Sequence, residues 1–242
     1  MVLMACRSRF RFDVGGMKPK TFFITGTDTG VGKTVLTTLL ARFLRERGVN
    51  AVALKPICSG GRADARALCA AMNGALSLDE INPWHFRAPI APVLAARRER
   101  KHVRLSKVLA HVRVMQKRFD ALLVEGAGGL LSPLGENFDS SDLIAALGAM
   151  PIIVAPNRLG VVNHVLLTLE ALPRSAASKA CVVLMSPPKW DAAVVTNAGL
   201  LAGFFDAKRI FTLPWLGIHF SSGEVLRKPQ VRRTLRALAP DD

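Results

Sequence analysis

Residues 21 to 34 constrain the fold most strongly, because an apolar run is followed there by a glycine-rich turn and a helix-forming sequence. The run reads TFFIT and the turn reads GTDTGVGKT. A strand, a glycine-rich turn and a helix in this order direct successive backbone N–H groups and the helix N-terminus at an anion. Lys33 adds a full positive charge, and the hydroxyl of Thr34 is suited to magnesium. The segment therefore predicts a phosphate-binding loop.

The spacing of this loop departs from the common pattern GxxxxGK[ST]. Five residues, Thr27 to Val31, separate Gly26 from Gly32, which is one more than the common pattern contains. The structural alternative is a glycine-rich turn that only reverses the chain. Because GKT follows a strand-like run, we favour a variant phosphate loop.

Apolar runs and helical patterns alternate along the rest of the chain. The strand-like runs are TFFIT, AVALKPI, ALLVEG, PIIVAP, CVVLM and RIFTLP, and the helical patterns span 33–47, 64–73, 104–118, 140–148, 161–172 and 191–205. Short, continuously apolar strands separated by helices are typical of a parallel sheet that is buried on both faces. The pattern predicts an α/β fold, a doubly wound and mostly parallel sheet with helices on both faces. Residues 222–238 then predict a closing helix that is broken near Pro229.

The chain is long enough and apolar enough for one full core. It has 242 residues, of which 50% are hydrophobic. We expect residues 21–242 to form a single domain and residues 1–20 to be a basic N-terminal extension, with Met17 as an alternative start. The extension lacks the apolar core and cleavage site of a secretory signal, and an organellar transit peptide is the weaker alternative.

Composition excludes several classes of protein. No apolar stretch reaches the roughly 18 uncharged residues that a membrane span needs. The four cysteines form no CxxC pair, which is typical of reduced thiols in a cytosolic protein, and the five histidines show no metal-ligand spacing that would predict a zinc site. We therefore expect a soluble, cytoplasmic protein.

The formal net charge of +15 raises the question of an anionic partner. Residues 97–118 carry nine basic residues against Glu99 alone, and apolar residues recur among them at helical spacing. The basic residues would then occupy the outward face of an amphipathic helix. We favour a solvated face over a nucleic-acid surface because no aromatic residues interleave with the charges. Neither a membrane nor a nucleic acid is expected as a partner.

Acidic and basic residues stand at the ends of two further apolar runs. Glu125 ends ALLVEG before a pair of glycines, where a carboxylate could hold magnesium or be an ordinary strand-end charge. Lys55 lies at the carboxyl edge of the second predicted strand, and the turn at Pro56 would leave it and Ser59 facing a crevice. A solvated lysine is the alternative. Asp64 could cap the following helix or provide a second carboxylate to magnesium.

Six motifs occur in an order that is typical of one enzyme family. They are GTDTGVGKT, KPICSG, NPWHF, LVEGAGGLLSPL, LGVVNHVLLT and PWLG. Together they resemble dethiobiotin synthetase, the ATP-dependent carboxylase of biotin biosynthesis. The resemblance runs from about residue 21 to 220, and the extra residue in the phosphate loop is the family's own form.

The resemblance implies a homodimeric P-loop enzyme that closes the ureido ring of dethiobiotin. Its substrates would be 7,8-diaminononanoate, carbon dioxide and ATP, with Mg2+ as cofactor. A carbamate formed on one amine attacks the γ-phosphate, and the second amine then attacks the mixed anhydride and expels phosphate. Both steps place negative charge on oxygen atoms, so cations and N–H donors matter more than a catalytic triad.

The family's residue roles carry over to the matching positions of this chain. Catalysis is implied for Lys55 and Lys33. Nucleotide binding is implied for Gly30, Val31, Gly32, Lys33, Thr34, Val35, Glu125, Gly126, Ala127, Gly128, Pro214, Trp215 and Leu216. Substrate binding is implied for Thr29 and Ser59 and, from a helix N-terminus across the dimer interface, for Gly160, Val161 and Asn163. Magnesium binding is implied for Thr34, Asp64 and Glu125.

The chain departs from the family where the nucleotide base would bind. Family members usually have an Asn after the strand that matches CVVLM, whereas Met185 and Ser186 here precede two prolines. No acidic residue follows PWLG before Glu224, so a family contact to the ribose is also missing. The sequence leaves the preferred nucleoside triphosphate open.

Two other classes share the variant loop or the ATP chemistry. An ATP-driven switch of the partitioning or cell-division type would use the positive charge to bind DNA or anionic lipid. Such switches usually carry an additional lysine early in the loop, where this chain reads TDTG. An ammonia-using ligase normally adds a glutaminase domain with a catalytic Cys, for which this chain has neither the length nor a suitable Cys and His. Both rank below dethiobiotin synthesis.

Overall fold

The computed structural model describes residues 20–217 and 221–239. Parts of all six predicted runs form one sheet, ordered β2-β5-β1-β6-β7-β8. Its strands are β1 (Lys20–Gly26), β2 (Ala51–Leu54), β5 (Ala121–Glu125), β6 (Met150–Pro156), β7 (Cys181–Met185) and β8 (Ile210–Leu213). Every neighbouring pair is parallel. On one side of β1 the chain runs to the edge strand β2 and returns to β5, and on the other side it proceeds outward through β6, β7 and β8. The predicted doubly wound α/β fold is confirmed.

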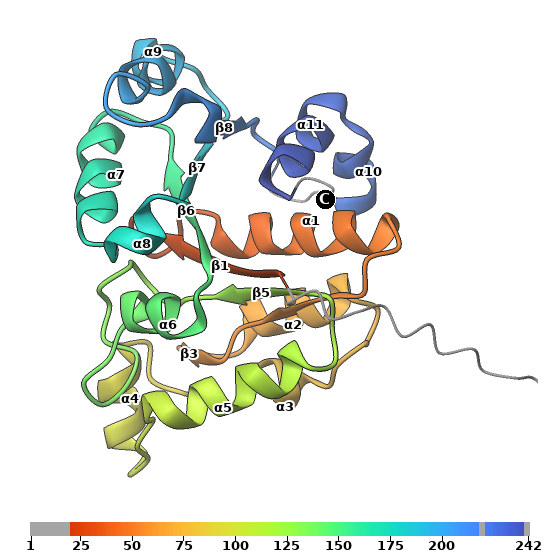
Figure 1. The fold of residues 1–242 in the computed structure, drawn as a ribbon, viewed down its shortest axis with the longest axis vertical. Helices are drawn as coiled ribbons and strands as arrows, with labels where there is room; N and C mark the ends of the chain where they lie inside the picture. The colour runs from red at the N-terminus through yellow and green to blue at the C-terminus, as the bar shows by residue number, and fades with distance from the viewer. Residues whose placement is uncertain (1–19, 218–220, 240–242) are drawn as a thin grey trace, which may run out of the picture.

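Helices cover both faces of this sheet (Figure 1). On one side lie α1 (Lys33–Glu46), α10 (Ser222–Arg227) and α11 (Pro229–Leu238), and on the opposite side lie α5 (Leu105–Gln116) and α6 (Ser140–Leu147). The remaining long helices are α2 (Ala63–Ala71), which packs on α1 and β2, α7 (Val161–Glu170) on β6, and α9 (Ala192–Leu201) on β8. The short α8 (Arg174–Ala177) also packs on β6.

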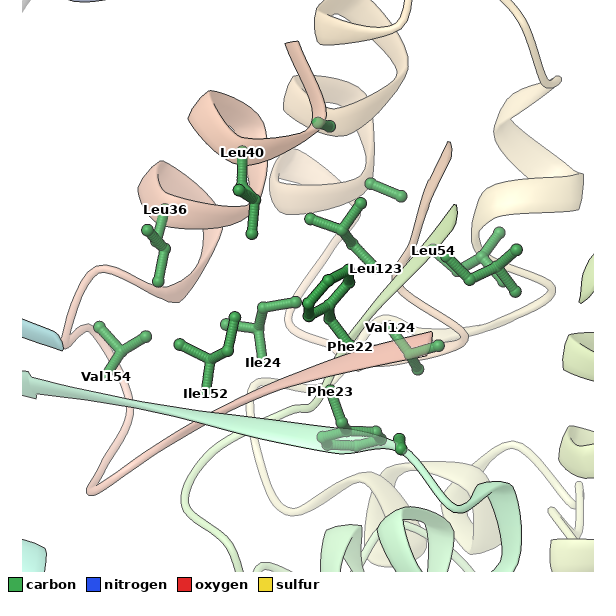
Figure 2. Close-up of a cluster of buried hydrophobic side chains, with 14 of the residues drawn as sticks. Phe22, Phe23, Ile24, Leu36, Leu40, Leu54, Leu123, Val124, Ile152 and Val154 are labelled. Atoms are coloured by element: carbon green, nitrogen blue, oxygen red, sulfur yellow. The ribbon is translucent and has the colours of Figure 1, made fainter. Parts of the chain in front are cut away.

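The central strand β1 divides its side chains between the two layers of helices. Figure 2 shows Phe22 and Ile24 on the side of β1 that faces Leu36 and Leu40 of α1, whereas Phe23 lies on the opposite side. All five side chains are buried. Burying one such side chain fully contributes about 1.5–3 kcal/mol, so both layers hold β1 in place. The loop that follows β1 is therefore fixed at the carboxyl edge of the sheet.

The predicted strand AVALKPI is wrong in its second half. β2 ends at Leu54, and residues Ile57–Ser59 form β3, which pairs with β4 (Trp84–Phe86) in a separate two-stranded parallel sheet. Pro56 has no N–H for a ladder, which explains the break between the two sheets. The stretch NPWHFRAPIAP thus contains β4 and the start of α4 (Pro92–Arg98). The short helix α3 (Leu78–Ile81) before it was not predicted.

The basic stretch 97–118 is not one helix. α4 ends at Arg98, Arg100 adopts a positive φ of 54°, and α5 begins at Leu105. The amphipathic pattern of α5 is confirmed, since Val108, Val112 and Met115 are buried. Three of the basic residues form ion pairs: Arg97 Nη2 lies 2.8 Å from Glu136, Lys101 Nζ lies 3.1 Å from Glu99, and Arg118 Nη1 lies 2.9 Å from Glu80. Partners within the chain thus occupy part of the charged surface.

Both ends of the chain bear on the sequence predictions. The predicted break near Pro229 is confirmed, because α10 ends at Arg227 and α11 begins at Pro229. The basic extension and Met17 lie outside the described residues, apart from Lys20, which starts β1. Within residues 20–217 and 221–239, every helix is too short or too polar to cross a bilayer.

Candidate active site

The phosphate loop joins β1 to α1 in the order that the sequence predicts. Gly32 caps α1 with a φ of 101°, and Gly30 has a φ of 74°, so both occupy the left-handed region that favours glycine. A Cβ on Gly26 would lie 2.7 Å from a methyl carbon of Val31, which leaves no room for a side chain. The glycines at these three positions therefore allow a tight loop that side chains would disturb.

Lys33 begins α1, and its side chain folds back over the loop. Its amine donates a hydrogen bond of 2.7 Å to the carbonyl oxygen of Asp28, and the residue is buried. Burial, followed by the positive charge of Lys55, lowers the pKa of Lys33 to about 8. A phosphate group in the loop would give this desolvated cation an anionic partner.

Lys55 is the centre of a buried cluster at the carboxyl edge of β2 and β5. Its amine lies 2.6 Å from Oε1 of Glu125, 3.0 Å from Oδ2 of Asp64 and 3.0 Å from the carbonyl oxygen of Gly126. The hydroxyl of Thr34 donates to the same Glu125 oxygen at 2.7 Å. Side chains from two strand ends, α1 and α2 thus meet around one carboxylate.

The charges in this cluster hold one another in the ionised state. Burial alone would lower the pKa of Lys55, but the negative charges of Glu125 and Asp64 outweigh burial and raise it. Burial would raise the pKa of Asp64, whereas the charge of Lys55 and the hydrogen bonds from Lys55 and Thr34 lower it. The alternative of a solvated strand-end lysine is therefore wrong, since Lys55 is 3% exposed.

Asp64 does not cap α2, which corrects one of the two roles considered for it. The helix begins at Ala63 with Arg62 in the capping position and no side-chain cap. Asp64 instead lies in the first turn and directs its carboxylate at Lys55. This orientation leaves its second predicted role, as an oxygen ligand, compatible with the geometry.

The oxygen atoms around Lys55 suit a magnesium ion. Mg2+ prefers oxygen ligands and usually takes one or two carboxylates together with phosphate oxygens and waters. Oε2 of Glu125 is buried and has no hydrogen-bond partner among the described residues, and the side chain of Asp64 is half exposed. A buried, unpaired carboxylate oxygen is costly unless something binds it. The donor set of Thr34, Asp64 and Glu125 therefore fits the metal.

An open pocket of about 680 Å³ lies over this cluster. The predicted site residues that line it are Thr29, Gly30, Gly32, Lys33, Thr34, Val35, Lys55, Ser59, Asp64, Ala127 and Gly128. Glu125 and Gly126 lie beneath its floor, where both bind the amine of Lys55. Val31 packs into the core at 6% exposure. The structure thus gathers most of the predicted residues around one cavity.

Several lining residues were not predicted as site residues. They are Cys58, Pro89, Ile90, Ala91, Pro92, Ser132 and Pro133. Cys58 lies within the motif KPICSG, and Ser132 and Pro133 lie within LVEGAGGLLSPL. These motifs therefore indicated the parts of the chain that form the pocket, though not these residues. The segment 89–92 lies outside the six motifs and carried no signal in the sequence.

Two predicted groups lie away from this pocket. Gly160 caps α7 with a φ of 87°, Val161 is buried and Asn163 is exposed, and none of the three lines the cavity. Pro214, Trp215 and Leu216 follow β8 and are also absent from its lining. Within this chain alone, the structure does not bring either group to Lys55.

Met185 closes the side of the phosphate loop next to β7. It ends β7, and a Cβ on Gly32 would lie 3.1 Å from its side chain. Its carbonyl oxygen accepts a hydrogen bond of 2.8 Å from the backbone of Asn157. A thioether therefore lies against the loop at this position.

A doubly wound parallel sheet with this loop and cationic pocket defines a P-loop nucleotide-binding protein. A family model described as AAA domain matches residues 20–218. The solved structure titled "Structure of pNOB8 ParA bound to nonspecific DNA" is similar with a TM-score of 0.57, over 91% of this chain and 97% of that one. Its sequence identity is 11%, so that likeness extends to the fold alone.

Relatives in sequence are far more similar. The ATP-dependent dethiobiotin synthetase BioD of Anaeromyxobacter dehalogenans strain 2CP-C is 41% identical over 221 residues, which is 89% of this chain and 94% of the relative. The enzyme of the same name from Akkermansia muciniphila is 38% identical over 78% of this chain and 89% of its own length. The enzyme of the same name from Methanocaldococcus jannaschii is 40% identical over 62% of this chain and 72% of its own length. The chain belongs to the ATP-dependent dethiobiotin synthetase family.

Proposed function

We propose that this chain makes dethiobiotin from 7,8-diaminononanoate, carbon dioxide and ATP, and releases ADP and phosphate. The observation that carries the proposal is the convergence of Lys33 and Lys55 on one pocket of about 680 Å³, with Glu125 paired to Lys55 beneath its floor. Family membership supports the same reaction. The pocket offers charge and hydrogen-bond donors without a protein nucleophile, which suits a reaction whose substrates provide their own nucleophiles.

In this proposal Lys55 acts on the carbamate and the phosphoryl group that it attacks. Its amine is protonated and buried, so it offers a positive charge that solvent does not screen. A carbamate oxygen entering the pocket would take over part of the contact that Asp64 makes now. Lys55 would then stabilise the negative charge that builds up during phosphoryl transfer and again during ring closure.

The phosphate loop would bind the triphosphate through Gly30 to Val35. Their N–H groups and the amine of Lys33 would provide the donors, and Ala127 and Gly128 also line the pocket. Magnesium held by Thr34, Asp64 and Glu125 would supply positive charge to the phosphate oxygens. Thr29 and Ser59 on the same lining would contact the diamine substrate. Pro214 to Leu216, beyond β8, would contact the nucleotide outside this cavity.

A homodimer would complete the substrate site. Gly160, Val161 and Asn163 lie at the N-terminus of α7, outside the pocket of their own chain. Leu159 and Leu167 are 85% and 61% exposed beside them, so this region offers apolar surface to a second subunit. The helix N-terminus would then bind the substrate carboxylate in the partner's pocket. We further propose that residues 21–242 act as one cytoplasmic domain.

One assay tests the reaction. The protein is mixed with diaminononanoate, bicarbonate, magnesium and each nucleoside triphosphate in turn, and dethiobiotin is measured by mass spectrometry. We expect product that depends on the diamine and on the triphosphate. Hydrolysis of ATP at the same rate with and without diamine, and no dethiobiotin, would refute the proposal.

A further inference from the structure

We propose that Asn82 is a positioning residue for this reaction, because its buried side-chain amide joins the main chain of Lys55 to Arg62 at the start of α2. The inference rests on the proposed function. Asn82 begins the motif NPWHF, to which the site described above gives no role. It follows α3 and is fully buried, with 0% exposure.

The first half of the bridge fixes Lys55. The Nδ2 atom of Asn82 donates a hydrogen bond of 2.7 Å to the carbonyl oxygen of Lys55. The backbone N–H of Lys55 donates to the carbonyl oxygen of Ile81 at 3.0 Å. Residues 81 and 82 thus hold both polar groups of the Lys55 main chain just where the strand leaves the sheet. This fixes the point from which the lysine side chain reaches into the cluster.

The second half of the bridge fixes Arg62 and therefore α2. Oδ1 of Asn82 accepts a hydrogen bond of 3.1 Å from Nε of Arg62, and the Asn82 carbonyl oxygen accepts another of 3.0 Å from Nη2. Nη2 also donates to the carbonyl oxygen of Leu78 at 2.7 Å. Arg62 precedes α2 directly, and Asp64 lies in its first turn. The bridge thus sets the place of the Asp64 carboxylate relative to Lys55.

The chain between these two points needs such a tie. Gly60 and Gly61 have φ values of 77° and 111°, so the connection runs through two residues with wide conformational freedom. The contact that matters for the chemistry, 3.0 Å between Lys55 and Asp64, spans this connection. A misplacement of about 1 Å of a catalytic group can lower a rate by about 100-fold. By holding Lys55 and Arg62 together, Asn82 limits the conformational freedom of the connection that would otherwise allow such a misplacement.

The experiment is a double-mutant cycle with Asn82→Ala and Arg62→Met. We expect each variant to lower kcat by about 10- to 100-fold with little change in the KM for ATP or diamine, because the groups that bind substrate remain. The double variant should lose no more than the worse single variant, since both break one bridge. Asp79→Asn is the matched control: it removes the 2.8 Å ion pair of Arg62 and leaves the bridge intact.

Stability is measured in parallel, with Val231→Ala in α11 as a buried substitution far from the pocket. If Asn82→Ala loses stability but its kcat matches that of Val231→Ala, the inference is overturned. Multiplicative losses of kcat in the double variant would also overturn it. Should Asn82→Ala fail to fold, Arg62→Met carries the test. The Arg62 side chain is only 15% exposed, and Met preserves the packing of its alkyl part while removing the guanidinium group. A wild-type protein that makes no dethiobiotin would instead refute the proposed function.

Discussion

The amine of Lys55 and Oε1 of Glu125 are 2.6 Å apart because their strands are neighbours in register. Leu54 of β2 pairs with Val124 of β5, so the next residue of each strand extends from the same edge of the sheet. Both side chains are buried there, the lysine at 3% exposure and the glutamate at 1%. The strand register therefore brings both residues to one edge of the sheet, where the hydrogen bonds from Ile81 and Asn82 hold the main chain of Lys55.

The first prediction concerns Lys55→Ala. We expect nucleotide binding to remain nearly intact while dethiobiotin formation is abolished, because the alanine leaves the phosphate loop in place and removes the cation from the reacting groups. The free energy of unfolding should fall by about 3–5 kcal/mol, since the buried Glu125 loses its partner. Calorimetric binding of ATP, product formation and thermal unfolding measure the three effects. Retained ring closure would contradict the catalytic role, and exposed Lys179→Ala is the control.

The second prediction concerns Lys33→Ala. The Lys33 amine lies over the phosphate loop, and a hydrogen bond to a charged group contributes about 1.5–3 kcal/mol. We therefore expect the Kd for ATP to rise by about 10- to 100-fold, a loss of binding that Lys55→Ala should not show. Titration of ATP in the presence of magnesium measures it. Unchanged affinity would mean that Lys33 does not contact the phosphates.

Sequence alone predicted the main sheet and the charged residues at the ends of its strands. Continuous apolar runs identified the central strands, and polar residues that end such runs, Lys55 and Glu125, could be placed at one edge. It did not predict the small sheet of β3 and β4, because strands of three residues carry no periodicity. The bridge between Arg62 and Asn82 also has no local signature, since its two residues come from separate turns of the chain.

The third prediction tests the metal site with Asp64→Asn. The amide keeps the size of the side chain but loses the charge that pairs with Lys55 and would attract magnesium. We expect the magnesium concentration for half-maximal activity to rise by about 10- to 100-fold. The affinity for Mg2+ in the presence of ADP, measured by calorimetry, should weaken in parallel. The control is Asp120→Asn, an exposed carboxylate away from the pocket. An equal magnesium requirement in Asp64→Asn and the control would exclude a role in metal binding.

The fourth prediction concerns stability at alkaline pH. Burial raises the pKa of the Cys181 thiol in β7 to about 11. The folded protein therefore keeps this proton where the unfolded chain, with an ordinary thiol, loses it. The resulting stabilisation is complete below about pH 9 and is lost as the pH rises toward about 11. Urea unfolding at intervals across this window measures it. In Cys181→Ala this part of the pH dependence should disappear, and an unchanged slope would show that other groups cause it.

The fifth prediction concerns the choice of nucleotide. A site discriminates strongly between related ligands when its buried polar groups would be left unpaired by the wrong one. Met185 presents a thioether beside Gly32 and offers no strong donor or acceptor to the edge of a base. We therefore expect kcat/KM for ATP, GTP and CTP to agree within about tenfold, and Met185→Asn to increase the preference for ATP. Leu184→Met, at a buried position of the same strand, controls for a general disturbance of β7. A strong preference for ATP in the wild-type protein would show that other groups read the base.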